Sequence, residues 1–206
     1  TRSRGLGDVY KRQAWCCACS RAWSLAITLP VWRPAWTPSS PWAVNDVMLG
    51  ELNRHEADLA VDLCLDSILN SPHSKYPAPQ RTKWASVDRA DWVRRLASQH
   101  THAARDTQGT LLGVGSWCEK ASSTAWLDLL YVAPTCQRQG TGLMLLQAVE
   151  RDARQRGMIR LQTQASLHLL PLLQRRGFCV LEHRFAGPDD DLPCAWMEKV
   201  LQGVPG

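Results

Sequence analysis

The sequence contains no apolar run long enough to cross a membrane, so membrane-spanning helices are not expected. It also shows no internal repeat. Phenylalanine and tyrosine are scarce, with two and three residues among 206, whereas tryptophan occurs ten times. Five of the ten tryptophans lie between Trp15 and Trp42, and this uneven distribution marks a boundary in the chain.

A charge excess is missing from most of the chain as well. The chain has 24 basic and 19 acidic residues. Residues 1–43 contain six basic residues and one acidic residue, and residues 44–206 contain eighteen of each. The isoelectric point near 8.9 therefore reflects the first 43 residues alone. A basic surface for nucleic acid is not expected on the remainder.

Residues 1–43 are interpreted as a leader that is not part of a domain. The segment Asp8–Gln13 resembles a reading-frame translation of the transposon end used to prepare sequencing libraries. Residues 14–43 have no periodic pattern, which indicates translated upstream DNA or a disordered leader. A signal peptide is the alternative, but the apolar run 22–29 is short and no small-x-small cleavage site follows it. We expect one domain over residues 44–202 and a tail over residues 203–206.

Cysteine spacing gives neither a disulfide framework nor a metal site. Three of the eight cysteines fall in the leader, and the other five are scattered and odd in number: Cys64, Cys118, Cys136, Cys179 and Cys194. None of these five has Cys-x-x-Cys spacing, and no His-x-x-x-His pair occurs, so no metal is expected. Lone cysteines are typical small core residues of a protein in a reducing cytoplasm.

Periodicity after the leader alternates between strands and helices. Asn53 and Glu56 have the spacing of a capping box, and Leu59, Leu63, Cys64 and Ile68 are expected to form the buried stripe of the helix that follows. Residues 70–80 are expected to be irregular, and a second helix follows Asp88 with Trp92, Val93 and Leu96 on one face. Strands are predicted over residues 47–52, 102–106, 109–118, 126–132, 158–164, 178–185 and 194–201.

The segment Gln137–Gly142 lies between the strand at residues 126–132 and a helix-like run that ends at Gly157. A strand, a turn with glycines and a helix N-terminus form an anion site, because unpaired backbone N–H groups and the helix dipole converge there. Gly140 and Gly142 leave room for a phosphate, and Arg138 adds a positive charge. A dinucleotide fingerprint fits less well because Leu145 occupies the place of its third glycine, and no Gly-Lys-Ser/Thr follows for a P-loop.

The pattern Gln/Arg-x-x-Gly-x-Gly/Ala resembles the pyrophosphate motif of the GNAT superfamily of acetyl-CoA-dependent N-acetyltransferases, and Gln137, Gly140 and Gly142 match every fixed position. The resemblance covers roughly residues 44 to 201. It implies an α/β (α+β) fold with a mixed, mostly antiparallel central sheet flanked by about four helices. The segments Asp128–Val132 and Arg175–Phe178 are similar to those of a small bacterial subgroup whose substrates are undefined.

The resemblance also implies a set of site residues. Backbone groups of Leu130, Tyr131 and Val132 are expected to bind the thioester and pantetheine, as an added strand would. The segment joining the first two helices is expected to wall the acceptor pocket through Tyr76, Gln80 and Trp84, although the two aromatic residues could equally cover the core. The remaining expected cofactor contacts are Gln137, Arg138, Gln139, Gly140, Thr141, Gly142, Leu143 and Ser166.

Catalysis requires a group that removes a proton from the acceptor ammonium. Asp128 is the one acid in the otherwise apolar strand that enters the site, so we predict it to be the base, with a structural hydrogen bond as the alternative. Many family members protonate the leaving sulfur with a tyrosine seven residues beyond an asparagine. Ser166 and Leu173 stand at those positions here, and Leu173 cannot donate a proton. Tyr131 could take its place as the proton donor, with a role in packing as the alternative.

The sequence therefore predicts a cytoplasmic enzyme that transfers an acetyl group from acetyl-CoA to a primary amine of a small molecule or peptide. A catalytically silent acyl-CoA-binding module is the alternative, and the missing tyrosine favours it. No nucleic-acid or membrane partner is expected, a homodimer remains open, and the acceptor is undefined among antibiotics, polyamines, amino acids and protein N-termini.

Overall fold

The computed structural model describes residues 47–186 and 191–201. The predicted leader and tail lie outside these residues. One sheet of seven strands has the order β1-β2-β3-β4-β5-β7-β6, and all neighbours are antiparallel except the parallel pair β4 and β5. The strands are β1 (Met48–Glu51), β2 (His100–Arg105), β3 (Leu111–Ala121), β4 (Thr124–Val132), β5 (Arg160–Ser166), β6 (Cys179–Ala186) and β7 (Leu192–Val200).

Five α-helices and two short 3-10 helices accompany the sheet within the described residues. They are η3 (Arg54–Glu56), α2 (Ala57–Asn70), α3 (Ala78–Ala85), α4 (Arg89–Ser98), η4 (Pro134–Cys136), α5 (Thr141–Gln155) and α6 (Leu170–Arg175). None of the described helices is both long and apolar enough to span a membrane. The mixed, mostly antiparallel sheet confirms the predicted fold class.

Local signals explain where several helices begin and end. The capping box is confirmed, because the Asn53 side chain accepts from the His55 backbone N–H and Glu56 accepts from the Asn53 N–H. Asp88 caps α4 by accepting from two backbone N–H groups of its first turn. Gly157 follows α5 with φ of +80°, a left-handed conformation that favours glycine.

Two sequence predictions in the helical region were wrong. Leu59 is 54% exposed, and the buried stripe of α2 instead comprises Ala57, Ala60, Val61, Cys64 and Ser67. Small residues form this stripe because α2 packs closely against the sheet and α4. Helix α3 begins at Ala78, inside the stretch predicted to be irregular, since Pro79 is tolerated in the first turn of a helix.

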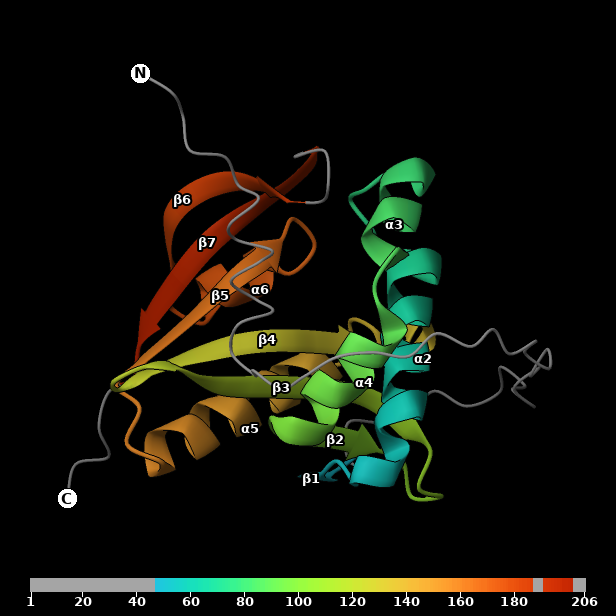
Figure 1. Ribbon diagram of the computed structural model, residues 1–206. Helices are drawn as coiled ribbons and strands as arrows, with labels where there is room; N and C mark the ends of the chain where they lie inside the picture. The colour runs from blue at the N-terminus through green and yellow to red at the C-terminus, as the bar shows by residue number, and fades with distance from the viewer. Residues whose placement is uncertain (1–46, 187–190, 202–206) are drawn as a thin grey trace.

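The helices cover both faces of the sheet (Figure 1). Helix α5 packs on one face, where Leu146 and Val149 meet Ala125 and Leu127 of β4. Helices α2 and α4 cover the other face, where Cys64, Trp92 and Leu96 meet Val114 and Leu129. The five cysteines of the described residues are free; three are buried, as predicted, whereas Cys118 is half-buried and Cys179 is exposed.

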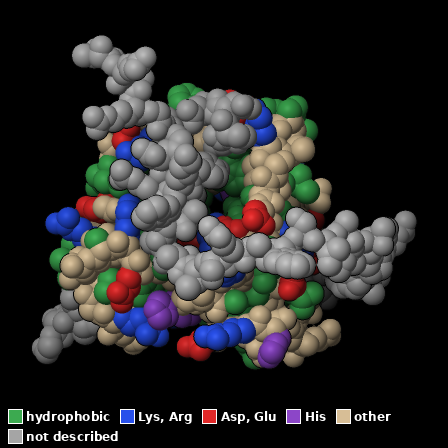
Figure 2. Space-filling view, in the orientation of Figure 1, with side chains coloured by type: hydrophobic (Ala, Val, Ile, Leu, Met, Phe, Trp, Pro, Cys, Tyr) green, Lys and Arg blue, Asp and Glu red, His purple; other side chains and the backbone are tan. Residues whose placement is uncertain are grey.

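Charges of both signs share the surface. Figure 2 shows Lys and Arg side chains mixed with Asp and Glu side chains along the lower edge of one face, without a patch of a single sign. This mixing agrees with the equal numbers of basic and acidic residues after residue 43.

Candidate active site

The sheet opens between its two parallel strands. β4 and β5 pair only at Thr124–Trp126, which face residues 160–162, and no further β4–β5 pair follows within the described residues. The hydroxyl of Thr163 donates to the carbonyl oxygen of Leu127 at 2.9 Å and closes the base of the opening. The C-terminal half of β4 therefore presents a backbone edge that β5 does not occupy.

A β-bulge at Asp128 sets which side chains face the opening. Ser116 of β3 faces Leu129, and Trp117 faces Leu127, so Asp128 is an extra residue on β4. Leu127 packs on the α5 side, whereas Leu129 packs on the side of α2 and α4. Asp128 bonds to residues of α4 and so shares the face of Leu129. The bulge thereby reverses the alternation of β4 just before the site.

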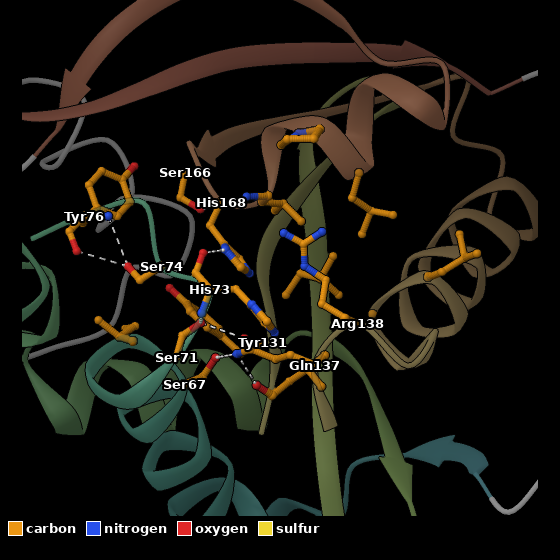
Figure 3. A pocket seen from close by; sticks show the side chains of 18 of the residues that line it. Ser67, Ser71, His73, Ser74, Tyr76, Tyr131, Gln137, Arg138, Ser166 and His168 are labelled. Carbon is orange, nitrogen blue, oxygen red and sulfur yellow. Dashed lines mark hydrogen bonds between the residues drawn. The ribbon is translucent and has the colours of Figure 1, made fainter. Parts of the chain in front are cut away.

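A cavity of about 890 Å³ lies in front of this opening (Figure 3). Its walls come from the end of α2, from α3, β4, the turn before α5, the end of β5, and α6. Most of the site residues predicted from the sequence line it: Tyr76, Trp84, Leu130, Tyr131, Val132, Gln137, Arg138, Gly140, Gly142, Leu143 and Ser166. Gln80, Asp128, Gln139 and Thr141 do not line it.

The turn before α5 has the backbone that an anion site needs. Gly140 is the N-cap of α5 with φ of +93°, and Arg138 also has a positive φ of +62°. A Cβ added to Gly142 would lie 3.5 Å from a methyl group of Val132, which is ordinary contact, so space is available there. The first N–H groups of an α-helix have no partner inside the helix, and Gly140, Gly142 and Leu143 at this end of α5 line the cavity.

Gln137 binds protein groups in this structure. Its amide nitrogen donates to the Val132 carbonyl oxygen at 3.1 Å and to the Ser67 hydroxyl at 3.2 Å, and its amide oxygen accepts from Ser71 at 2.7 Å. The labelled side chains in Figure 3 show this group at the foot of the cavity. Gln137 thus ties the end of β4 to the end of α2, which fixes the turn that follows. Gln139 similarly donates to the carbonyl oxygen of Thr135 at 2.8 Å.

Cations gather at the end of the cavity formed by α5 and α6. Arg138, Arg175 and Arg176 line it, and Arg176 also lies 3.9 Å from the buried Glu150. Nδ1 of His168 donates to the carbonyl oxygen of His73 at 2.9 Å. Burial lowers the pKa of His168 and nearby Arg138 lowers it further, against the opposing effect of this hydrogen bond. His168 is therefore neutral at pH 7, and the positive charge here comes from the arginines.

An aromatic wall stands at the other end. Tyr76 and Trp84 stack with ring centroids 5.5 Å apart, and the indole N–H of Trp84 donates to the Tyr131 hydroxyl at 3.2 Å. The Tyr76 hydroxyl donates to the carbonyl oxygen of Pro193 at 2.6 Å and accepts from the Leu167 backbone N–H at 2.9 Å. Burial raises the pKa of Tyr76 to about 12, although the Leu167 hydrogen bond opposes this. Tyr76 therefore both lines the cavity and joins β5 to β7.

We predict that Tyr76→Phe lowers the free energy of unfolding by about 1–3 kcal/mol, because it leaves the Leu167 N–H and the Pro193 carbonyl without their partner. Thermal melts of the variant and the wild type should show a lower melting temperature. Turnover of the folded fraction should change little, since the ring and its stacking on Trp84 are retained. An unchanged melting temperature with lost turnover would instead identify the hydroxyl as a substrate contact.

Asp128 lines a second, smaller cavity of about 110 Å³ that shares Trp84, Leu130 and Tyr131 with the first. Its side chain is only 4% exposed. Nε of Arg95 donates to Oδ2 at 2.9 Å, the other arm of the same guanidinium pairs with Oδ1, and Gln99 donates to Oδ2 at 2.8 Å. A carboxylate offers about four acceptor positions, so one position remains after these three bonds.

The two positions where the sequence departs from the family pattern have structural roles. Leu173 is fully buried in the cluster beneath α5 and cannot reach the cavity. The hydroxyl of Ser166 accepts from the Leu169 backbone N–H at 3.3 Å and so supports the turn that leads into α6. Sequence reasoning did not single out Arg95 of α4 and Gln99, which follows α4, because they lie 33 and 29 residues from Asp128.

The sequence model of the acetyltransferase (GNAT) family matches residues 65–178, more than half of the chain. A GCN5-related N-acetyltransferase from Rhodopseudomonas palustris is 25% identical, with a TM-score of 0.68 over 79% of this chain and 100% of that one. No curated protein matches.

Two further solved structures are similar in fold. The PaiA N-acetyltransferase from Thermoplasma acidophilum, in complex with coenzyme A, is 16% identical with a TM-score of 0.61 over 75% of this chain and 98% of that one. The ribosomal-protein-S18-alanine N-acetyltransferase from Escherichia coli is 14% identical with a TM-score of 0.60 over 78% of this chain and 96% of that one.

Proposed function

The chain belongs to the GNAT family of acetyltransferases, and we propose that it transfers an acetyl group from acetyl-CoA to a primary amine of a small molecule or peptide. The observation that supports this most directly is the open edge of β4, which faces a cavity running from the α5 N-terminus to an aromatic wall. An extended molecule with phosphates at one end and a thioester at the other suits that shape. We infer a cytoplasmic location from the five free cysteines.

The residues at the turn fit a pyrophosphate. The left-handed Gly140 and the space at Gly142 allow close approach to the backbone, and Arg138 supplies a positive charge. The adjacent residues Gln139, Thr141 and Leu143 complete the turn, while Gln137 and Ser166 hold its surroundings in place. Backbone groups of Leu130, Tyr131 and Val132 would pair with the pantetheine arm and polarise the thioester carbonyl.

The transfer needs a neutral amine. Its nitrogen would attack the thioester carbonyl, a C–N bond would form, and the C–S bond would break with departure of the coenzyme A thiolate. We propose that Asp128, directly or through a water, accepts the proton lost by the acceptor ammonium. Because leucine at position 173 has no acidic proton to give, we propose that the sulfur leaves as a thiolate. A thiol pKa of about 8.5 makes a thiolate a tolerable leaving group.

We expect the full chain to release coenzyme A from acetyl-CoA in proportion to added primary amine. A thiol-detecting assay over a panel of amines measures this, and N-acetylated forms of the same amines serve as controls that should give no release. Calorimetric titration with acetyl-CoA should show binding in parallel. Binding without amine-dependent release would contradict the enzyme and favour the silent acyl-CoA-binding module.

A further inference from the structure

The charged residues that line the main cavity are all basic within the described part of the chain. They are the four arginines Arg81, Arg138, Arg175 and Arg176, and no Asp or Glu lines the cavity. If every charged group of the acceptor were cationic, its cavity would be expected to offer an unpaired carboxylate. The charges here favour an occupant with more than one anionic group.

Arg81 stands apart from the other three arginines. It lies on α3 (Ala78–Ala85), three residues before Trp84, whose ring stacks on Tyr76. Figure 3 shows Tyr76 and Arg138 on opposite sides of the cavity. Arg138 therefore belongs to the end with the α5 turn, while Arg81 belongs to the aromatic end, where the acceptor is proposed to bind.

No anionic partner of Arg81 is found among the described residues. Its side chain is half-buried, and Nε is fully buried without a hydrogen bond. No carboxylate of the described residues forms an ion pair with it, whereas two other polar residues of α3 are bonded to Asp191, namely Gln80 at 3.0 Å and Lys83 at 2.6 Å. A buried guanidinium N–H without a partner is unfavourable, so this group is suited to bind an anion that enters the cavity.

The neighbouring cavity does not compensate this charge. Asp128 is the one acid that lines it among the described residues, and the guanidinium of Arg95 already pairs with both carboxylate oxygens. Within the described residues, the aromatic end therefore combines a carboxylate that is already paired with Arg95 and one cation, Arg81, that has no ion pair. An acceptor that carries an anionic group beside its amine would give Arg81 an anionic partner.

We propose that Arg81 binds a carboxylate of the acceptor, so that the substrate class is an amine that also carries a carboxylate, as a free amino acid does. This inference rests on the proposed acetyl transfer to an amine. The planar fork of a guanidinium matches a carboxylate with two parallel hydrogen bonds, which orients the acceptor as well as binding it. Polyamines and polycationic antibiotics would place further positive charge near Arg81 and are disfavoured.

The first test compares matched acceptors on the full chain. Proteinogenic amino acids, their carboxamides and the corresponding decarboxylated amines are assayed at saturating acetyl-CoA. The carboxylate-bearing acceptors should have kcat/KM values at least about tenfold higher than their carboxamides, because a charge-assisted bidentate contact is lost in the amide. A preference for carboxamides, decarboxylated amines, polyamines or peptides would overturn the proposal.

The second test changes Arg81. Arg81→Gln should lower kcat/KM for the carboxylate acceptors about 10- to 100-fold, chiefly through KM, and leave the carboxamides within about twofold. Arg81→Lys should recover part of the loss, because it keeps the charge without the fork. Arg94→Gln removes one exposed arginine of α4 and serves as the charge-matched control, with no expected change.

Binding without turnover separates this proposal from the proposed function. Calorimetry with N-acetyl amino acids, which retain the carboxylate, should show affinity that falls at least about tenfold in Arg81→Gln. Loss of acetyl-CoA affinity in Arg81→Gln would instead identify a cofactor phosphate as the partner and would overturn the proposal. Carboxylate binding that depends on Arg81, without acetyl transfer to any amine, would remove the enzyme function and keep the anion site.

Discussion

Gly142→Asp is expected to weaken acetyl-CoA binding at least about tenfold, which corresponds to about 1.4 kcal/mol or more. Gly142 lies in the first turn of α5 and lines the cavity where the pyrophosphate is proposed to bind. A carboxylate there would repel the phosphates and fill their space. The fold should survive, because a Cβ at this position meets the nearest atom at 3.5 Å and an acid in the first turn is favourable for a helix. Calorimetric titration with acetyl-CoA measures the effect.

Gly142→Ala is the matched control, since it adds the Cβ without the charge. Its affinity should stay within about threefold of the wild type, and its melting temperature should not fall, because alanine is the better helix former. Gly140 is a poorer site for this test. Its φ of +93° would strain any other residue and so combine a folding defect with a binding defect. Equal affinities for Gly142→Asp and Gly142→Ala would place the phosphates elsewhere.

The sequence predicted the strands and the α5 turn well because their signals are local. The apolar, aromatic and β-branched residues of β4, the glycines before α5 and Gly157 after it are each signals from a few neighbouring residues. The capping box at Asn53 and Glu56 belongs to the same class and is confirmed. Local propensity and tertiary structure agree at these positions, so the local sequence is sufficient to predict the structure there.

The buried face of α2 could not be predicted in the same way. Several of its positions are apolar or small, and a shift of one or two residues gives another plausible stripe. Contact with the sheet and α4 selects Ala57, Ala60 and Val61 and leaves Leu59 exposed. The phase of that helix is therefore a property of the packing, which a single sequence does not specify.

Long-range partners explain what was missed at the site. The sequence shows Asp128 as a lone acid in an apolar strand, but its environment depends on Arg95 and Gln99, which lie about thirty residues away on α4 and directly after it. The bulge that directs Asp128 toward α4 depends on the pairing of β4 with β3. No glycine lies next to Asp128 in the sequence to indicate a bulge there. That Arg81 lines the cavity without an ion pair among the described residues is likewise visible only in the structure.

Asp128→Asn is expected to lower turnover at neutral pH by roughly 10²-fold, if Asp128 is the base as proposed, with acetyl-CoA binding nearly unchanged. An amide keeps the shape but cannot accept the proton. The same change also leaves the Arg95 guanidinium, whose side chain is 14% exposed, without its counter-charge, which costs about 3–5 kcal/mol of stability in a buried pair. Rates must therefore be corrected for the folded fraction, measured by thermal melts on the same preparation.

The double variant Arg95→Gln/Asp128→Asn separates the two effects. Removing both charges should restore much of the lost stability, because no uncompensated ion remains beside β4. Turnover should stay about 10²-fold low in this stable protein if the carboxylate takes the proton. Arg95→Gln alone keeps that carboxylate, so its folded fraction should retain far more activity than the double variant. Near-normal turnover in the double variant would show that Asp128 positions β4 against α4, and a water would then be the proton acceptor.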